Sequence, residues 1–216
     1  MSFLMNSSQY IDYIHRAAKK IAENKEYISE LDAVTGDGDH WANLNLGFEN
    51  LIAEGEQIRQ MPMDAAFMKI GMIMMSKIGG SSGILYGGAY MAAGRAISGK
   101  AEITSEELCK ALDVMVQDMM ERGKAKPGYK TMIDALYPAV EAYKKALEEG
   151  MDNHLAMQMV KNAARDGAEA TRGMEAVKGR ASYQTEKGIG CLDPGAVTMS
   201  YQIECLCDYI CETFCG

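Results

Sequence analysis

The stretch NSSQYIDYIHRAAKKIAEN, residues 6–24, shows the pattern that decides the fold class. Its apolar residues recur at the three- and four-residue spacing of one helix face, namely Ile11, Ile14, Ala17, Ala18 and Ile21. Alanine, methionine, leucine, glutamate and lysine dominate the rest of the chain, and these residues favour helices. With 18 methionines and only four prolines in 216 residues, the sequence predicts an all-α protein.

Comparable patterns predict about eight helices along the whole chain. Thr104 with Glu107 forms a capping box, Asp152 caps another helix, and Asp193 followed by proline begins the last. No linker rich in proline, serine or glycine divides the sequence, so we expect one domain over residues 1–216. The predicted helices cover approximately 6–24, 40–53, 62–77, the residues after 83 up to 97, 104–121, the residues after 130 up to 149, 152–171, and 193 onward.

Glycine, aspartate and arginine concentrate in four predicted loops, at 31–39, 79–83, 122–130 and 172–192. Each of these loops follows an odd-numbered helix in the predicted order. In an up-and-down arrangement such loops emerge at the same end. The helix order therefore predicts that the polar clusters meet on one surface.

The net charge of -8 argues against nucleic acid as a partner, because an acidic surface repels a phosphate backbone. A nucleotide is compatible with this charge where cations lie between carboxylates and phosphates. No apolar run approaches the roughly 20 residues of a membrane span. The first part of the chain lacks the basic-then-apolar order of a signal peptide. We therefore expect a cytoplasmic protein with no membrane partner.

The segment DAVTGDGDH, residues 32–40, is the strongest chemical signal. Asp32, Asp37 and Asp39 lie close together in sequence, and crowded carboxylates repel one another unless a cation lies among them. A calcium-binding EF-hand does not fit, because Trp41 and Phe48 would stand at its fifth and twelfth positions. Magnesium fits better, since it takes few carboxylates and completes its shell with water and phosphate. The alternative is a turn with an aspartate cap before a helix, and spacing alone does not separate the two.

Three further regions suit phosphate, although each alone also fits an ordinary loop. GGSSG, at 79–83, precedes a helix whose first N–H groups can bind an anion, but it lacks the lysine of a P-loop. RGKAKPGYKTM, at 122–132, is basic. GRASY, at 179–183, contains Arg180, whose planar fork fits phosphate oxygens, and DPGA follows at 193–196.

Taken together and in this order, these segments resemble the L subunit of dihydroxyacetone kinase, the DhaL family. The family's run Gly-Asp-Gly-Asp-His-Gly-x-Asn-Met, with an earlier aspartate, is matched by Asp32, Asp37, Asp39, His40 and Asn43. Its run Gly-Gly-x-Ser-Gly-x-Leu-Tyr-Gly is matched by residues 79–87. Its run Gly-Asp-Lys-Thr-Met-x-Asp is matched by Gly128, Lys130, Thr131, Met132 and Asp134. GRASY and DPGA match directly, so the resemblance spans nearly the whole chain.

The resemblance implies an eight-helix antiparallel up-and-down barrel that binds ADP or ATP at one rim. It implies that the catalytic and metal-binding residues are Asp32, Asp37 and Asp39, which would hold two Mg²⁺ ions that bridge the phosphates. It implies that the phosphates lie along His40, Trp41, Ala42, Asn43, Ser81 and Ser82. The residues implied around the base and ribose are Gly123, Met132, Arg180, Asp193, Pro194 and Gly195.

The implied activity is the transfer of a phosphoryl group to a small ketose held by a separate K subunit. In one scheme of the family ATP is consumed, and in the other ADP stays bound and is rephosphorylated by an M subunit of the phosphotransferase system. A free-standing L chain resembles the second scheme. The alternatives are a non-catalytic nucleotide-binding regulatory module and a kinase subunit for another small carbonyl substrate such as a tetrulose. The substrate, the donor and a homodimer are left open.

The chain departs from the family pattern in three places, the last being residues 184–192, where several residues change. Trp41 replaces a glycine, Leu44 a methionine and Tyr129 an aspartate, and Cys191 stands where the family often has histidine. The three aspartates are intact, so phosphoryl chemistry remains the expectation. The departures bear on the partner and the substrate, and they fit a divergent paralogue.

Overall fold

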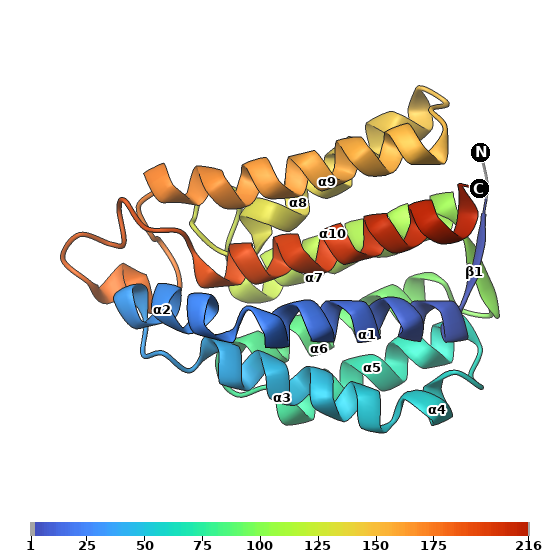
Figure 1. Ribbon diagram of the computed structural model, residues 1–216, viewed down its shortest axis with the longest axis horizontal. Coiled ribbons are helices and arrows are strands. Elements are labelled where there is room, and N and C mark those ends of the chain that lie inside the picture. The colour runs from blue at the N-terminus through green and yellow to red at the C-terminus, as the bar shows by residue number, and fades with distance from the viewer. Residues whose placement is uncertain (1–2, 216) are drawn as a thin grey trace. The chain divides into compact units, whose positions relative to one another are not determined.

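The computed structural model describes residues 3–215, and this range contains ten α-helices and one two-stranded sheet (Figure 1). Strands β1 (Leu4–Asn6) and β2 (Glu102–Thr104) pair antiparallel. Helix dominates, so the predicted all-α class is confirmed. None of the helices described is both long and apolar enough to cross a membrane. The helices are α1 (Ser7–Glu23), α2 (Lys25–Thr35), α3 (His40–Ala53), α4 (Gly55–Ile58), α5 (Met63–Lys77), α6 (Gly80–Ala96), α7 (Ser105–Gly123), α8 (Ile133–Glu148), α9 (Asn153–Ala170) and α10 (Pro194–Phe214).

Helix α2 corrects the first part of the loop predicted over residues 31–39, because the helix continues to Thr35, whereas residues 36–39 form the predicted connection. The helix buries Ile28, Asp32 and Thr35, which share one helix face. Two of these three residues are polar, so hydrophobic periodicity does not reveal the helix. The predicted interruption at 79–83 is also wrong beyond its first residue, because α6 begins at Gly80. The short helix α4 and the small sheet were not predicted.

The predicted helix starts are confirmed where a side-chain cap defines them. Thr104 accepts a hydrogen bond from the backbone N–H of Glu107, whose carboxylate accepts one in return, at the start of α7. Asp152 caps α9, and Asp193 caps α10 with Pro194 in the first turn. Each of these caps satisfies a backbone N–H that has no acceptor within its helix.

The described chain divides into two compact units. The first comprises the described residues up to Lys19 together with Asn43–Lys124, and it holds the sheet and α4 to α7. The second comprises Lys20–Ala42 and the described residues from Ala125 onward, and it holds α2, α8, α9 and α10. The chain passes between the units within α1 and within α3. The single domain expected over residues 1–216 stays a prediction.

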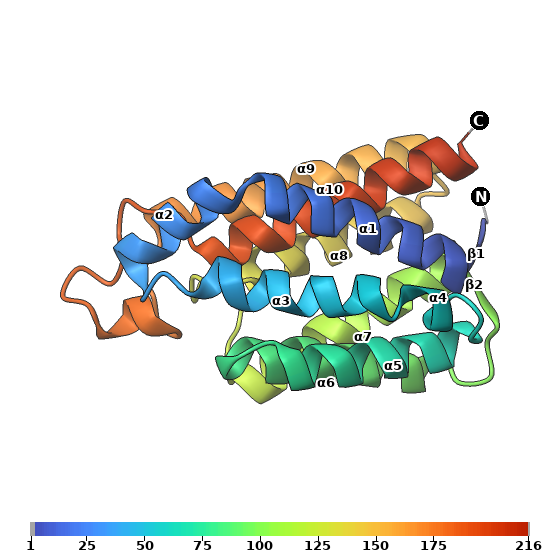
Figure 2. The same cartoon turned by 60° about the horizontal axis from the view of Figure 1, so that its bottom comes forward.

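In the first unit, α5 lies beside α6, and α6 also packs against α7 (Figures 1 and 2). Glycine permits the close contact of α5 with α6, since a Cβ added to Gly87 would lie 2.7 Å from the carbonyl oxygen of Gly71. The core includes the rings of Tyr10, Phe67 and Tyr90, and the hydroxyls of the two tyrosines are 3.0 Å apart. This packing fixes α6, whose first turn carries both predicted phosphate-binding serines, Ser81 and Ser82.

In the second unit, α8, α9 and α10 pack against one another, and α2 packs against α10. Gly167 of α9 approaches the carbonyl of Asp134 on α8 so closely that a Cβ would collide with it. Pro138, one helical turn later, has no N–H to donate to that carbonyl. The start of α8 and the end of α9 are therefore held together, and both lead into the loops of the candidate site.

Candidate functional site

Asp32, Asp37 and Asp39 come together where α2 turns back into α3. Asp32 is buried on α2, whereas Asp37 and Asp39 are exposed in the connection of residues 36–39. One carboxylate oxygen from each residue lies within 4.8 Å of the others. Hard oxygen donors at this spacing are the ligands that magnesium takes from proteins, so the three residues fit the predicted metal. We call them the aspartate trio.

The trio is held by hydrogen bonds at the end of α2. Asp32 Oδ2 accepts the backbone N–H of His40 at 2.9 Å, and the Asp32 carbonyl accepts that of Gly36 at 2.5 Å. A Cβ at Gly36 would collide with Asp32 Oδ1, so a side chain at this position would displace the Asp32 carboxylate. Asp32 thus fixes the connection at both of its ends, through its carbonyl at Gly36 and through its carboxylate at His40.

Side chains of the first turn of α3 are anchored within the second unit. His40 Nε2 lies 2.9 Å from the hydroxyl of Thr198 on α10, and enclosure lowers the pKa of this imidazole against the opposing effect of Asp32 and Asp39. Trp41 Nε1 donates to the carbonyl of Ile21, which uses the only polar hydrogen of the indole ring. The backbone N–H groups in the first turn of a helix have no acceptor within the helix. Trp41 and Ala42 lie in the first turn of α3, so their backbone N–H groups can donate to a phosphate.

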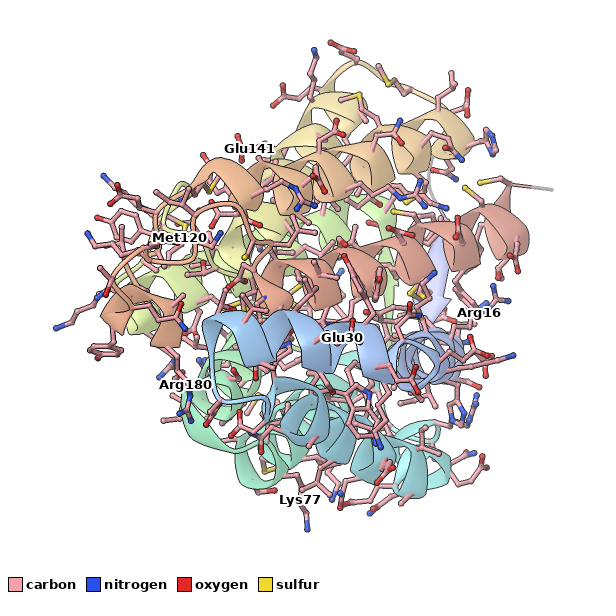
Figure 3. All side chains as sticks on the ribbon, turned by 60° about the vertical axis from the view of Figure 1, so that its left-hand side comes forward. Arg16, Glu30, Lys77, Met120, Glu141 and Arg180 are labelled. Atoms are coloured by element: carbon pink, nitrogen blue, oxygen red, sulfur yellow. The ribbon has the colours of Figure 1, made fainter. Side chains whose placement is uncertain are left out.

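Arg180 approaches the trio from the segment between α9 and α10, where Figure 3 labels it. Its guanidinium lies 2.5 Å from Asp37 Oδ2 and 3.8 Å from Asp39 Oδ2. Its charged partners among the described residues are thus two members of the trio. The place beside the base and ribose that the family resemblance implies for Arg180 stays a prediction.

Lys130 clamps the two ends of that segment together, and sequence reasoning missed this role. Its side chain is 1% exposed, and its ammonium donates to the carbonyls of Thr171 and Cys191 at 2.5 Å each. Burial lowers the pKa of Lys130, an effect that nearby Asp193 opposes. Apart from its place in the family motif, no signal in the basic loop distinguishes this lysine from Lys124 or Lys126.

Three of the four predicted loops meet within the second unit. The side-chain amide of Gln184 donates to the carbonyl of Val34, and the backbone N–H of Val177 donates to the carbonyl of Tyr129. These bonds join the segment between α9 and α10 to the α2–α3 connection and to the residues before α8. The meeting of all four loops at one end stays a prediction.

Met132, Asp193, Pro194 and Gly195 lie where α8 and α10 begin. A Cβ added to Gly195 would lie 3.7 Å from Met132 Cβ, so the two helix starts are in contact. The backbone N–H of Asp193 donates to the Thr171 hydroxyl, and its carboxylate accepts from Ala196. Enclosure of this carboxyl group raises the pKa of Asp193 to about 7.

The remaining predicted residues belong to the first unit. Asn43 lies beside Gly79, where an added Cβ would be 2.7 Å from Asn43 Oδ1. Ser81 and Ser82 follow in the first turn of α6, and Gly123 ends α7. The first unit therefore brings Asn43 to Gly79, two residues before Ser81, and the second unit holds the trio and Arg180.

The raised pKa of Asp193 predicts a pH dependence of stability. Between about pH 4 and about pH 7 the folded chain keeps a proton that the unfolded chain has released, so stability present at low pH is lost as pH rises through this range. An Asp193→Asn variant keeps a cap but has no proton to lose. We expect the variant to gain stability relative to the parent between about pH 4.5 and about pH 8 in urea unfolding. A constant difference across that range would contradict the assignment.

Known proteins resemble this chain in sequence. Residues 34–208 match the family described as the DAK2 domain. The chain is 32% identical over 202 residues to an Escherichia coli (strain K12) protein described as the ADP-binding subunit DhaL of PEP-dependent dihydroxyacetone kinase, covering 94% of this chain and 96% of that one. It is 35% identical over 200 residues to the Lactococcus lactis protein described as the ADP-binding subunit DhaL of PTS-dependent dihydroxyacetone kinase. That alignment covers 93% of this chain and 96% of the Lactococcus lactis chain.

The fold is also that of a solved protein. The dihydroxyacetone kinase of C. freundii superposes with a TM-score of 0.71 at 24% identity, over 92% of this chain and 34% of that chain. The structure of that kinase in complex with AMP-PNP and Mg²⁺ superposes with a TM-score of 0.68 at 24% identity. The superposition covers 92% of this chain and 33% of the kinase chain. At this identity the likeness shows the fold, while the family rests on the sequence matches. The chain, as its motifs suggested, belongs to the DhaL family of dihydroxyacetone kinase subunits, which contains the DAK2 domain.

Proposed function

We propose that this chain is the ADP-binding subunit of a dihydroxyacetone kinase linked to the phosphotransferase system, and that the aspartate trio holds two Mg²⁺ ions against the nucleotide phosphates. The observation that carries the proposal is the convergence of three carboxylate oxygens within 4.8 Å. Relatives in Escherichia coli and Lactococcus lactis, whose names describe this function, align over nearly their whole length.

The protein's part in the reaction is to position charge. Magnesium bound by the trio supplies positive charge to phosphate oxygens during transfer. Within the second unit, the first turn of α3 offers backbone N–H groups to these oxygens. Ser81 and Ser82, in the first turn of α6, stay predicted phosphate-binding residues. Met132 and the first residues of α10 contact the base and ribose of the nucleotide in this proposal. No residue of this chain needs to form a covalent phosphate intermediate.

In the proposed reaction ADP stays on this chain as a carrier. A phosphorylated M subunit gives its phosphoryl group to ADP, and the resulting ATP gives it to a ketose on a K subunit. This order follows from the family's two donor schemes and from the names of the two relatives, which describe PEP- and PTS-dependent enzymes.

Reconstitution tests the proposal. The purified chain is mixed with Mg²⁺, ADP, a K subunit carrying dihydroxyacetone and a phosphorylated M subunit, and ketose phosphate is followed by mass spectrometry. We expect product only when ADP and Mg²⁺ are both present. A four-carbon ketose in a parallel mixture reports the alternative substrate class. Absence of product with the M subunit and also with ATP would exclude a kinase role.

A further inference from the structure

Arg180 is placed where a bound cation would have to compete with it. Its two terminal nitrogens face Asp37 at 2.5 Å and Asp39 at 3.8 Å, and both carboxylates belong to the aspartate trio. Three carboxylates within 4.8 Å repel one another, and the guanidinium supplies a positive charge among them. A divalent ion bound to the same oxygens would repel this guanidinium at close range.

The ion pair is exposed enough to exchange. The side chains of Arg180, Asp37 and Asp39 are 62%, 37% and 50% exposed. Exposed ion pairs contribute little to stability, so Arg180 can leave at small cost when another anion is near. Phosphate is such an anion, since its oxygens accept both arms of a guanidinium.

The segment that carries Arg180 is fixed at its ends, and its exposed tip is joined to the α2–α3 connection by the side-chain amide of Gln184, which donates to the carbonyl of Val34. Lys130 clamps Thr171 to Cys191, and Gly190 N–H donates to the carbonyl of Arg172 at 2.8 Å. The residues from 182 to 187 are largely exposed. A turn of the Arg180 side chain therefore requires no opening of the base of the loop.

We propose that Arg180 couples nucleotide binding to divalent-cation binding in this chain, an inference that rests on the proposed function of the trio. Without nucleotide, the guanidinium holds Asp37 and Asp39 and weakens their affinity for a cation. The phosphates of a nucleoside diphosphate draw the guanidinium away, and the two carboxylates become available. Cation and nucleotide then strengthen each other's binding by the same factor, as linkage requires.

The Arg180→Gln variant tests this coupling, with Lys178→Gln as a control that removes the same charge from the same segment. The probe is Mn²⁺ alone, whose free concentration is read by electron paramagnetic resonance without nucleotide. We expect Arg180→Gln to bind Mn²⁺ about three- to tenfold more tightly than the parent. ADP affinity in saturating Mg²⁺ should fall about tenfold, because a phosphate partner is lost. Lys178→Gln should change neither value by more than about twofold.

The opposite signs of the two effects separate coupling from damage to the fold. A variant that only disturbs the loop would lose affinity for both ligands, which would overturn the proposal. Equal Mn²⁺ affinity in Arg180→Gln and Lys178→Gln would overturn it as well. Asp37→Asn distinguishes this failure from failure of the proposed function: if it weakens Mn²⁺ binding while Arg180→Gln leaves it unchanged, only the coupling is wrong. If Asp37→Asn has no effect either, the trio is not the metal site.

Discussion

Asp37→Asn is expected to lower the affinity for ADP in the presence of Mg²⁺ by about 100-fold or more. Loss of an outer-sphere partner of a metal ligand costs about 10- to 100-fold in metal affinity, and loss of a ligand itself should cost at least as much. Asp37 is the best member of the trio to change. Asp32 also fixes the turn into α3 through His40, so its substitution would confound binding with folding.

The measurement is isothermal titration of ADP with and without Mg²⁺. Asp166→Asn is the matched control, since Asp166 is an exposed carboxylate on α9 of the same unit. It should bind ADP as the parent does. In Asp37→Asn the weak binding that remains should no longer respond to Mg²⁺. Full retention of the Mg²⁺ effect would show that Asp37 is not a ligand.

Lys130→Met is expected to lower the free energy of unfolding by about 3 kcal/mol. Methionine keeps most of the buried stem, but the carbonyls of Thr171 and Cys191 lose a charged donor. Hydrogen bonds from charged groups contribute about 1.5–3 kcal/mol each to stability. The cost of burying the ammonium offsets part of the summed contribution of the two hydrogen bonds. The clamped segment should also become open to proteolysis.

Urea unfolding and limited proteolysis measure both effects. Lys178→Met serves as the control, because Lys178 lies in the same segment and is only half-buried. It should leave stability unchanged within about 0.5 kcal/mol. If Lys130→Met matched the control in both experiments, the two hydrogen bonds would not hold the segment.

The sequence predicts the fold class and most helix starts because local rules decide both. The stripe from Ile11 to Ile21 and the caps at Thr104, Asp152 and Asp193 act within a few residues, and all are confirmed. Helix α2 escapes prediction because its buried face carries Asp32 and Thr35. Asp32 is bonded to His40 in the turn that follows and Thr35 to Leu31, and hydrophobic periodicity does not record such polar contacts.

The candidate site is predictable in its acidic part and not in its cationic part. Asp37 and Asp39 are close because only one residue separates them in sequence. Asp32 lies near them because it belongs to the last turn of α2, directly before this connection. Arg180 and Lys130 reach their partners across long loops, so periodicity and spacing do not reveal which basic residues are used. Tyr129, which stands where the family has aspartate, also has contacts that spacing does not reveal. Its backbone carbonyl, which any residue could supply, accepts the N–H of Val177. The Lys126 ammonium lies 5.5 Å from the centroid of its ring.

The central claim is that cations bound to a nucleotide lie among the three carboxylates of the trio. Crystals grown with ADP and Mn²⁺ test it directly through anomalous scattering from the metal. The account predicts metal peaks at bonding distance from Asp32, Asp37 and Asp39, with the ADP phosphates on the other side and Arg180 turned away from Asp37. Metal peaks elsewhere, or bound ADP with Arg180 still paired to Asp37 and no metal in the trio, would contradict it.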